Sequence, residues 1–102
     1  MDILKIQELC KKQCVMYSKH VLDRMMQRNI MSDEIEQSIC NGKIIEEYPN
    51  DYPYPSCLIL GITLQKRFLH IVVGVTETNL WIITVYDPDK NKWNSNFTIR
   101  KE

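Results

Sequence analysis

The spacing of apolar residues changes once along this chain, at Asn41-Gly42, and this change limits the possible folds more than any other feature. Before it, apolar residues recur every three to four positions, which is the spacing of amphipathic helices. After it come short runs rich in Ile, Val, Leu and Tyr, which are typical of β-strands. Helices followed by strands predict an α+β domain, and 102 residues are enough for one domain with a modest core.

Three helices are expected before the change. They span residues 2–14, 17–28 and 32–41. Ser18 and Ser32 are expected to start the second and third helices, because a serine hydroxyl accepts hydrogen bonds from free helix N–H groups. Asn29 is expected to end the second helix, and Asn41-Gly42 the third. The apolar faces expected in the core consist of Ile3, Leu4, Ile6, Leu9 and Cys10 in the first helix, and of Val21, Leu22, Met25 and Met26 in the second.

Strands are expected after the change. Lys43–Tyr48 is a short candidate edge strand, and the three prolines between Pro49 and Pro55 exclude a helix and a central strand there. The further runs are Cys57–Thr63, Arg67–Val75 and Leu80–Tyr86. The connections between these runs are short enough for antiparallel hairpins. Beyond residue 87 the tail is expected to add a last strand through Ile99 and Arg100.

The charge balance excludes a broad nucleic-acid-binding surface but leaves room for a local one. The chain has 13 basic and 13 acidic residues and a formal net charge of zero, whereas a wide phosphate-binding surface needs an excess of positive charge. The basic residues gather in residues 1–28 and 57–102, and the acidic residues in residues 29–56. A local cationic site beside an acidic segment is therefore compatible with the composition.

Hydropathy and cysteine spacing indicate a cytoplasmic protein without a metal. No apolar run approaches the ~20 residues that cross a bilayer, and the segment MDILKIQELC lacks the apolar region of a signal peptide. We therefore expect no membrane partner. The four cysteines form no CxxC pair, so we expect free, buried thiols and no metal site.

A basic row follows one side of the second helix and is the first candidate functional feature. His20, Arg24 and Arg28 recur every four residues and lie within an arc of about 80° on a helix. Neither arginine has an acidic residue three or four positions away on its own helix. The basic row is therefore either a solvated surface or a phosphate-binding site, and the helix alone does not decide between them.

The strands supply further candidates. His70 lies in RFLHIVVGV, where alternation puts it on one strand face with Phe68 and Val72 and puts Leu69, Ile71 and Val73 on the other. A lone histidine in such a strand is more often structural than catalytic. Thr84 and Tyr86 share one face of the next strand. Whether His70 lies on that face depends on the register of the hairpin, and a slip of one residue would reverse the answer. Arg67 and Arg100 are additional cations on or beside the sheet.

These residue types suit RNA cleavage without a metal if they converge. A neutral histidine can take the proton of a ribose 2′-hydroxyl, arginines can clamp the phosphate, and a second histidine or a tyrosine can protonate the leaving oxygen. Asp51, Tyr52 and Tyr54 in the proline-rich loop could line a substrate groove, and the tyrosines could stack on bases with Trp81. The structural alternative is a stiff loop that covers a sheet edge.

Four motifs, taken in order, resemble a known family. They are the H-x3-R-x3-R-x-I helix from His20 to Ile30, the Y-P-x-D-x-P-x-P-S loop from Tyr48 to Ser56, Leu69-His70, and T-V-Y-x-P from Thr84 to Pro88. Over residues 17–100 the chain resembles a family of small bacterial domains of unknown function. That family is grouped with the RelE-like, barnase, EndoU and colicin nuclease folds, and its members are often encoded beside antitoxin-like zinc-finger proteins.

The resemblance implies a single RelE-like domain over residues 1–102, with helices packed on one face of a four-stranded antiparallel sheet. It implies a metal-independent ribonuclease without a cofactor, acting as the toxin of a toxin–antitoxin pair. The implied partners are RNA, free or on the ribosome, and a cognate antitoxin protein.

The resemblance also implies which residues form the site. The matched positions are His20, Arg24, Arg28, Asp51, Pro53, Ser56, His70, Thr84, Tyr86 and Pro88. The expected catalytic residues are His20, Arg24, Arg28, His70 and Tyr86. The expected substrate-binding residues are Asp51, Tyr52, Arg67, Thr84 and Arg100.

Two other function classes stay open. The first is a non-catalytic binding module, in which the basic row holds a partner's carboxylates and a sheet edge pairs with a partner's strand. The second is a helix-turn-helix DNA binder built from residues 17–41. It fits poorly, because the recognition helix would begin with Asp33, Glu34 and Glu36, which repel phosphates.

Overall fold

Local hydrogen bonds set the helix ends. The computed structural model describes residues 1–102. The Asp2 carboxylate accepts a hydrogen bond from the Leu4 N–H group at 2.9 Å, and the Ser18 hydroxyl accepts one from Val21 at 3.2 Å. Asn29 ends its helix in the left-handed conformation, with φ of 54°. The helices are α1 (Ile3–Lys11), α2 (Lys19–Arg28) and α3 (Ser32–Cys40).

The expected cap of the third helix is wrong by one residue. Met31 takes the N-cap position, and Ser32 is already helical. The Glu34 carboxylate accepts a hydrogen bond from the Met31 N–H group at 2.9 Å. A side chain that reaches back in this way satisfies one free N–H group of the helix start without a serine at the cap. The Asn41-Gly42 end is confirmed, because α3 stops at Cys40.

The sheet has five strands and is mixed. The strands are β1 (Val15–Tyr17), β2 (Lys43–Tyr48), β3 (Ser56–Ile62), β4 (Phe68–Val75) and β5 (Leu80–Tyr86), in the order β1-β5-β4-β3-β2. Neighbouring strands from β2 to β5 pair antiparallel as expected, but β1 pairs parallel to β5. The expected four-stranded antiparallel sheet is thus corrected by one added edge strand. Residues 15–17 are too few to show a period of two, and the expected helices leave residues 15 and 16 as a connection and include residue 17 in the second helix.

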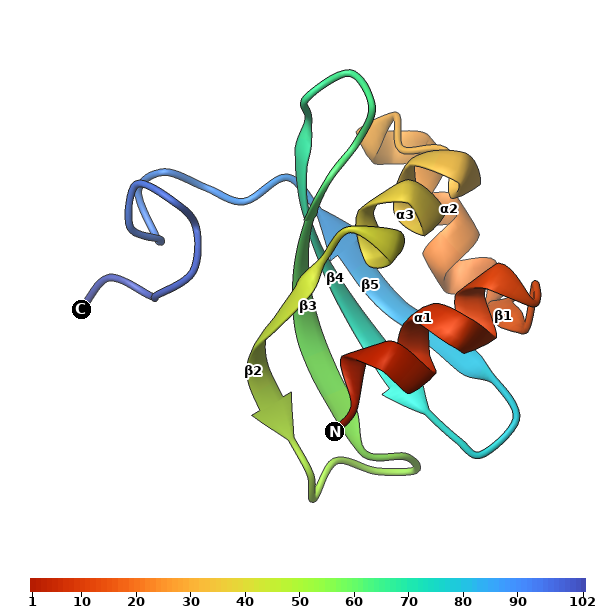
Figure 1. The fold of residues 1–102 in the computed structure, drawn as a ribbon. Helices are drawn as coiled ribbons and strands as arrows, with labels where there is room; N and C mark the ends of the chain where they lie inside the picture. The colour runs from red at the N-terminus through yellow and green to blue at the C-terminus, as the bar shows by residue number, and fades with distance from the viewer.

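The three helices cover one face of this sheet (Figure 1), which confirms the α+β class and the one-sided packing. Helix residues such as Ile6, Val21 and Ile35 pack there against strand residues such as Ile59 and Ile71. Part of the expected core is wrong, because Leu4, Leu22 and Met26 are 71%, 45% and 81% exposed. The helices bury a narrower stripe than the sequence pattern indicates. None of the helices is both long enough and apolar enough to cross a membrane.

Helix α3 lies directly on β3 at Gly61. A Cβ atom at Gly61 would come within 2.0 Å of the Ser38 carbonyl oxygen, and one at Gly42 within 2.5 Å of the same atom. Glycine is therefore needed at both positions for close approach, although neither has a positive φ. This contact holds α3 against β3, an interior strand next to the edge strand β2.

The C-terminal tail (residues 87–102) crosses to the sheet face opposite the helices (Figure 1). The expected last strand does not form, because Trp93 and Arg100 make only an isolated bridge. Trp93 is 3% exposed, and Leu58 and Leu60 are buried although they lie on the face without helices. The tail thus shields this second face of the sheet.

The four cysteines are free thiols as expected, but the expected burial holds only for two of them. Cys10 and Cys57 are buried, Cys14 is half-buried and Cys40 is exposed. Burial raises the pKa of Cys10 to about 12 and that of Cys57 to about 11. Both buried thiols therefore stay protonated at neutral pH and belong to the packing of the core.

Candidate functional site

The basic row lies along a stretch of β5 that has no strand on its outer side. β1 pairs with β5 only from Leu80 to Ile82, so the stretch from Ile83 to Tyr86 has β4 on one side only. Arg28 Nη1 donates a hydrogen bond to the Val85 carbonyl oxygen at 2.7 Å. This contact places Arg28 against the free stretch of β5, and Arg24 and His20 lie about one and two turns earlier on the same side of α2.

The basic row has no carboxylate partner. His20 and Arg24 are exposed and Arg28 is half-buried. Arg24 contacts only the Gln27 side-chain oxygen, at 3.4 Å, and Arg28 contacts the Val85 carbonyl. The structure therefore leaves these cationic groups available to an anion, which is the property that a phosphate site needs.

His70 and Tyr86 meet on the sheet face under the C-terminal tail. They are directly paired across β4 and β5, so the register puts both on one face. His70 Nδ1 lies 3.3 Å from the Tyr86 hydroxyl, and Nε2 lies 2.8 Å from the Phe97 carbonyl oxygen. Since a carbonyl only accepts, Nε2 carries the proton and Nδ1 accepts from Tyr86. His70 is 0% exposed, and its ring packs edge-on against Trp93 at 4.4 Å.

Burial sets the charge of this pair. It lowers the pKa of His70, while the Phe97 carbonyl and Glu46 act in the opposite direction. Burial raises the pKa of Tyr86, against the smaller effects of Arg100 and Arg28. Both groups are therefore neutral at neutral pH. Arg28 is near enough to Tyr86 to affect its ionisation, so Tyr86 links the basic row to His70.

Arg100 fastens the tail over this pair. Its Nε and Nη2 atoms donate to the two Glu46 oxygens at 2.8 and 3.1 Å, and its guanidinium carbon lies 4.7 Å from the Trp93 ring centroid. Tyr48 donates to the same carboxylate at 2.5 Å. Arg100, which was expected to bind substrate, is thus engaged by Glu46 and Trp93 within the protein. These contacts hold the tail over His70.

Arg67 joins the ends of four elements. It forms a two-fold hydrogen-bonded pair with Asp87 at 2.7 and 2.9 Å, and it donates to the carbonyl oxygens of Asn29 and Arg28 at 2.7 and 3.0 Å. Glu34 lies 3.5 Å away. The hydrogen bond from Arg67 lowers the pKa of Asp87. These contacts use the guanidinium to hold the end of α2 against β5.

The remaining expected substrate-binding residues are spread over two places. Asp51 accepts a hydrogen bond from Ser56 at 2.5 Å within the proline-rich loop. Tyr52 is the most exposed aromatic side chain, at 92%. Thr84 is half-buried within the free stretch of β5, on the same sheet face as Tyr86. The structure therefore places Thr84 at the sheet edge and uses Asp51 to shape the loop.

His20 and His70 do not share one site. His20 belongs to the helix layer and is exposed, whereas His70 lies on the opposite sheet face and is fully buried. Sequence reasoning missed what covers His70, namely the Trp93 ring and the Phe97 carbonyl, with Glu46 holding the tail. Glu46 and Arg100 are 54 positions apart, and no local pattern pairs residues at such a distance.

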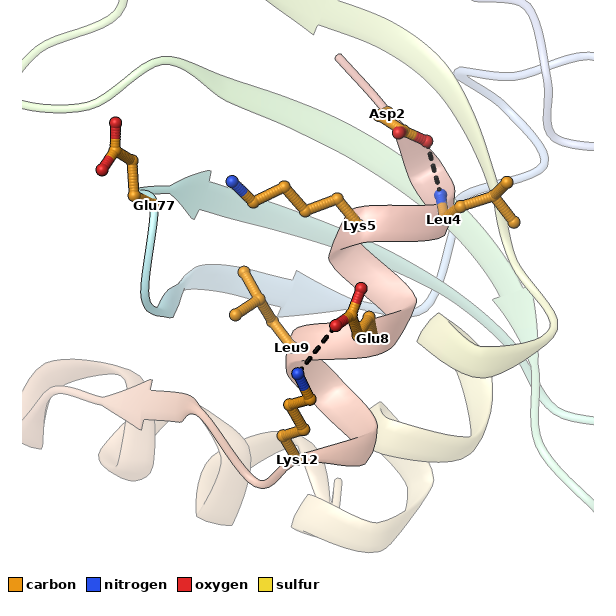
Figure 2. Close-up of a pocket in the computed structure, with 7 residues that line it drawn as sticks. All are labelled: Asp2, Leu4, Lys5, Glu8, Leu9, Lys12 and Glu77. Carbon is orange, nitrogen blue, oxygen red and sulfur yellow. Dashed lines mark hydrogen bonds and ion pairs between the residues drawn. The ribbon is translucent and has the colours of Figure 1, made fainter.

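A charged hollow of about 320 Å³ beside α1 contains none of the expected site residues. It is lined by Asp2, Leu4, Lys5, Glu8, Leu9, Lys12 and Glu77 (Figure 2). Lys12 pairs with Glu8 at 2.7 Å, and Lys5 extends toward Glu77 in the close-up. Its charges of opposite sign largely compensate one another, so this hollow is a weaker candidate than the basic row.

Comparisons with known proteins identify the family and leave the activity open. No match was found among curated proteins or among solved structures. The model of one family, described as domain of unknown function (DUF4258), matches residues 17–87. The match runs from the end of β1 through β5 and stops at the first residue of the tail. The chain therefore belongs to the DUF4258 family.

Proposed function

We propose that this protein is a metal-independent ribonuclease, acting as the toxin of a bacterial toxin–antitoxin pair on a RelE-like nuclease fold. The observation that carries the proposal is the basic row without carboxylate partners, which leads along the free stretch of β5 to Tyr86. Cationic and phenolic groups arranged in this way can hold a phosphodiester and stabilise added negative charge without a metal.

The reaction assigned to this row is transfer of the phosphate within the RNA. In this scheme Arg24 and Arg28 hold the phosphate, His20 precedes them on the same side of α2, and Tyr86 is near enough to Arg28 for its pKa to be affected. The His20 imidazole takes the proton of the 2′-hydroxyl, and the 2′-oxygen forms a bond to phosphorus. The bond to the 5′-oxygen breaks, and that oxygen receives a proton from the Tyr86 hydroxyl or from water. The products are a 2′,3′-cyclic phosphate and a free 5′-hydroxyl.

His70 positions Tyr86 in this scheme. Its Nδ1 atom accepts the Tyr86 hydrogen bond, and its ring is held by the Phe97 carbonyl and by Trp93. His70 would act as a base itself only after the tail moved away. His20 is the accessible imidazole and is therefore our choice for the base.

The toxin role is tested by growth of bacteria that express the protein. Wild type is expected to arrest growth, and His20→Ala with Arg24→Ala is expected to abolish the arrest. Lys19→Ala is the matched control, because Lys19 is an exposed cation of α2 about 100° away from His20. A double variant that is folded, expressed and still toxic would show that the site is assigned wrongly.

A second candidate, a non-catalytic binding module, is favoured by one feature. A hollow of about 550 Å³ between α2 and α3 is lined mainly by apolar side chains, among them Met25, Met26 and Met31. Exposed methionines suit adaptable protein contacts. A stable complex with a protein partner, together with no cleavage of any RNA, would favour this candidate. A shift of duplex DNA at physiological salt would instead favour the helix-turn-helix alternative.

A further inference from the structure

An aromatic pocket of about 260 Å³ lies where α2 begins. It is lined by Ser18, Tyr52, Pro53, Tyr54, Trp81, Ile82 and Ile83. Five of these seven residues are hydrophobic, and three carry aromatic rings. The aromatic pocket is built from the proline-rich loop, from β5 and from the residue that caps α2.

Tyr54 and Trp81 both line this pocket, and their rings are stacked. Their planes lie within 13° of parallel, and their centroids are 6.4 Å apart. Gly74 lies behind these rings, where a Cβ atom would make ordinary contacts of 3.4 to 3.7 Å with Ile83, Tyr54 and Trp81. A flat heteroaromatic ring that enters the pocket therefore meets π faces that are already oriented for stacking.

Tyr52 adds a third ring at the rim, and it is 92% exposed. Prolines at 49, 53 and 55 surround it, and proline restricts the main chain of such a loop. The Ser56 hydroxyl also holds the Asp51 carboxylate at the base of the loop, at 2.5 Å. A ring presented on a restricted loop loses little conformational freedom when it binds a ligand.

The pocket adjoins the free stretch of β5. Ile83 both lines the pocket and begins that stretch, and Arg28 contacts Val85 two residues further along. A single strand with one base in the pocket can therefore lay its backbone along this stretch toward Arg28. The larger methionine-lined hollow has no aromatic ring among its lining residues and offers no such stacking surface.

We propose that the aromatic pocket binds one unpaired nucleobase of a single-stranded RNA by stacking on Tyr54 and Trp81. This inference rests on the proposed ribonuclease function and names its substrate class. In a duplex the bases are paired and stacked on one another, so the pocket selects single strands. Stacking is available to every base, so the pocket gives strand selection with little sequence preference.

The test uses the two tryptophans separately. Trp93→Phe leaves Trp81 as the only tryptophan, and Trp81→Phe leaves Trp93. Each variant is titrated with a 2′-O-methyl RNA hexamer, which lacks the nucleophilic hydroxyl and cannot be cleaved, and with a duplex of the same sequence. We expect the hexamer to quench the fluorescence of Trp81 but not that of Trp93, and the duplex to quench neither.

A substitution in the pocket gives a second test. Trp81→Leu should weaken hexamer binding at least about fivefold. Leu64→Ala, at an exposed apolar residue outside the pocket, should not weaken it.

The outcomes separate the pocket from the ribonuclease function. Cleavage of ordinary RNA without quenching of Trp81, and with unchanged binding by Trp81→Leu, would overturn the pocket and leave the ribonuclease standing. Quenching of Trp81 by the hexamer without cleavage would support the pocket and count against the nuclease. Absence of both binding and cleavage would overturn both proposals. Circular dichroism of each variant establishes that it is folded.

Discussion

The imidazole of His70 and the phenol of Tyr86 form one buried pair, with Nδ1 and the hydroxyl oxygen 3.3 Å apart and the rings nearly perpendicular at 79°. The pair joins two regions that are far apart in the chain. On one side Arg28 of α2 influences Tyr86, and on the other side Phe97 of the tail binds His70. Changes at this pair should therefore affect both the stability of the protein and the proposed reaction.

Tyr86→Phe removes only the hydroxyl that satisfies His70 Nδ1. We expect the free energy of unfolding to fall by about 1–3 kcal/mol, because a buried acceptor is left without a partner. RNA cleavage should fall as well, since the phenol can no longer give a proton. Urea unfolding and an RNA cleavage assay measure the two effects. Unchanged stability would mean that the hydroxyl is not the partner of His70.

Stability should decrease as the pH falls below the ordinary histidine pKa of about 6.5. Burial lowers the pKa of His70, so below pH 6.5 the unfolded chain binds a proton that the folded protein does not. The lowered carboxylate pKa values of Glu46 and Asp87 act in a separate, more acidic range. Urea unfolding between pH 7.5 and pH 5.5 should show this loss in wild type and a smaller slope in His70→Gln. If stability changed equally with pH in the two proteins, His70 would not be the group responsible for the loss.

Arg100→Ala should open the tail over His70. The substitution removes the ion pair with Glu46 and the contact with the Trp93 ring. We expect diethyl pyrocarbonate to modify His70 several times faster, as followed by mass spectrometry of the peptide that contains His70. Lys101→Ala is the matched control, because it removes a neighbouring exposed cation that makes no ion pair. The same rate for both variants would show that Arg100 does not hold the tail closed.

Gly61→Ala should destabilise the protein by about 1–3 kcal/mol, the usual cost of overpacking. Its new Cβ atom would come within 2.0 Å of the Ser38 carbonyl, so α3 must move away from β3. Gly74→Ala is the comparison, because its nearest neighbour would be 3.4 Å away, which is close to ordinary contact. Thermal unfolding of both variants should give a clearly larger loss for Gly61→Ala. Similar losses would contradict the close approach of α3 to the sheet.

Much of the fold follows from periodicity and capping. The sequence predicts α2 and strands β2 to β5 nearly to the residue, because their apolar periods are clear and Ser18, Asn29 and prolines mark their ends. β1 was missed because three residues carry no period, and its pairing with β5 joins segments far apart in the chain. The exposure of Met26 was missed because a helical wheel gives the direction of a side chain but not the width of the surface that packs on it.

The sequence indicates which side of α2 carries the basic row, but not which contacts the other candidate residues make. The spacing of the basic row places three nitrogen-bearing side chains on one side of α2, and its contact at Val85 agrees with that spacing. The face of His70 depended on register, and the pairing with Tyr86 decides it. The use of Arg67 and Arg100 in internal contacts required the tertiary structure, because their partners Asp87 and Glu46 are 20 and 54 positions away.

RNA cleavage without a metal is tested most directly at the basic row. Purified wild type, Arg24→Ala with Arg28→Ala, and Lys19→Ala are incubated with a labelled mixed-sequence RNA in excess EDTA. We expect cleavage by wild type and Lys19→Ala and none by the double arginine variant. Equal cleavage by all three would contradict the site, and cleavage by none would contradict a ribonuclease that acts on free RNA.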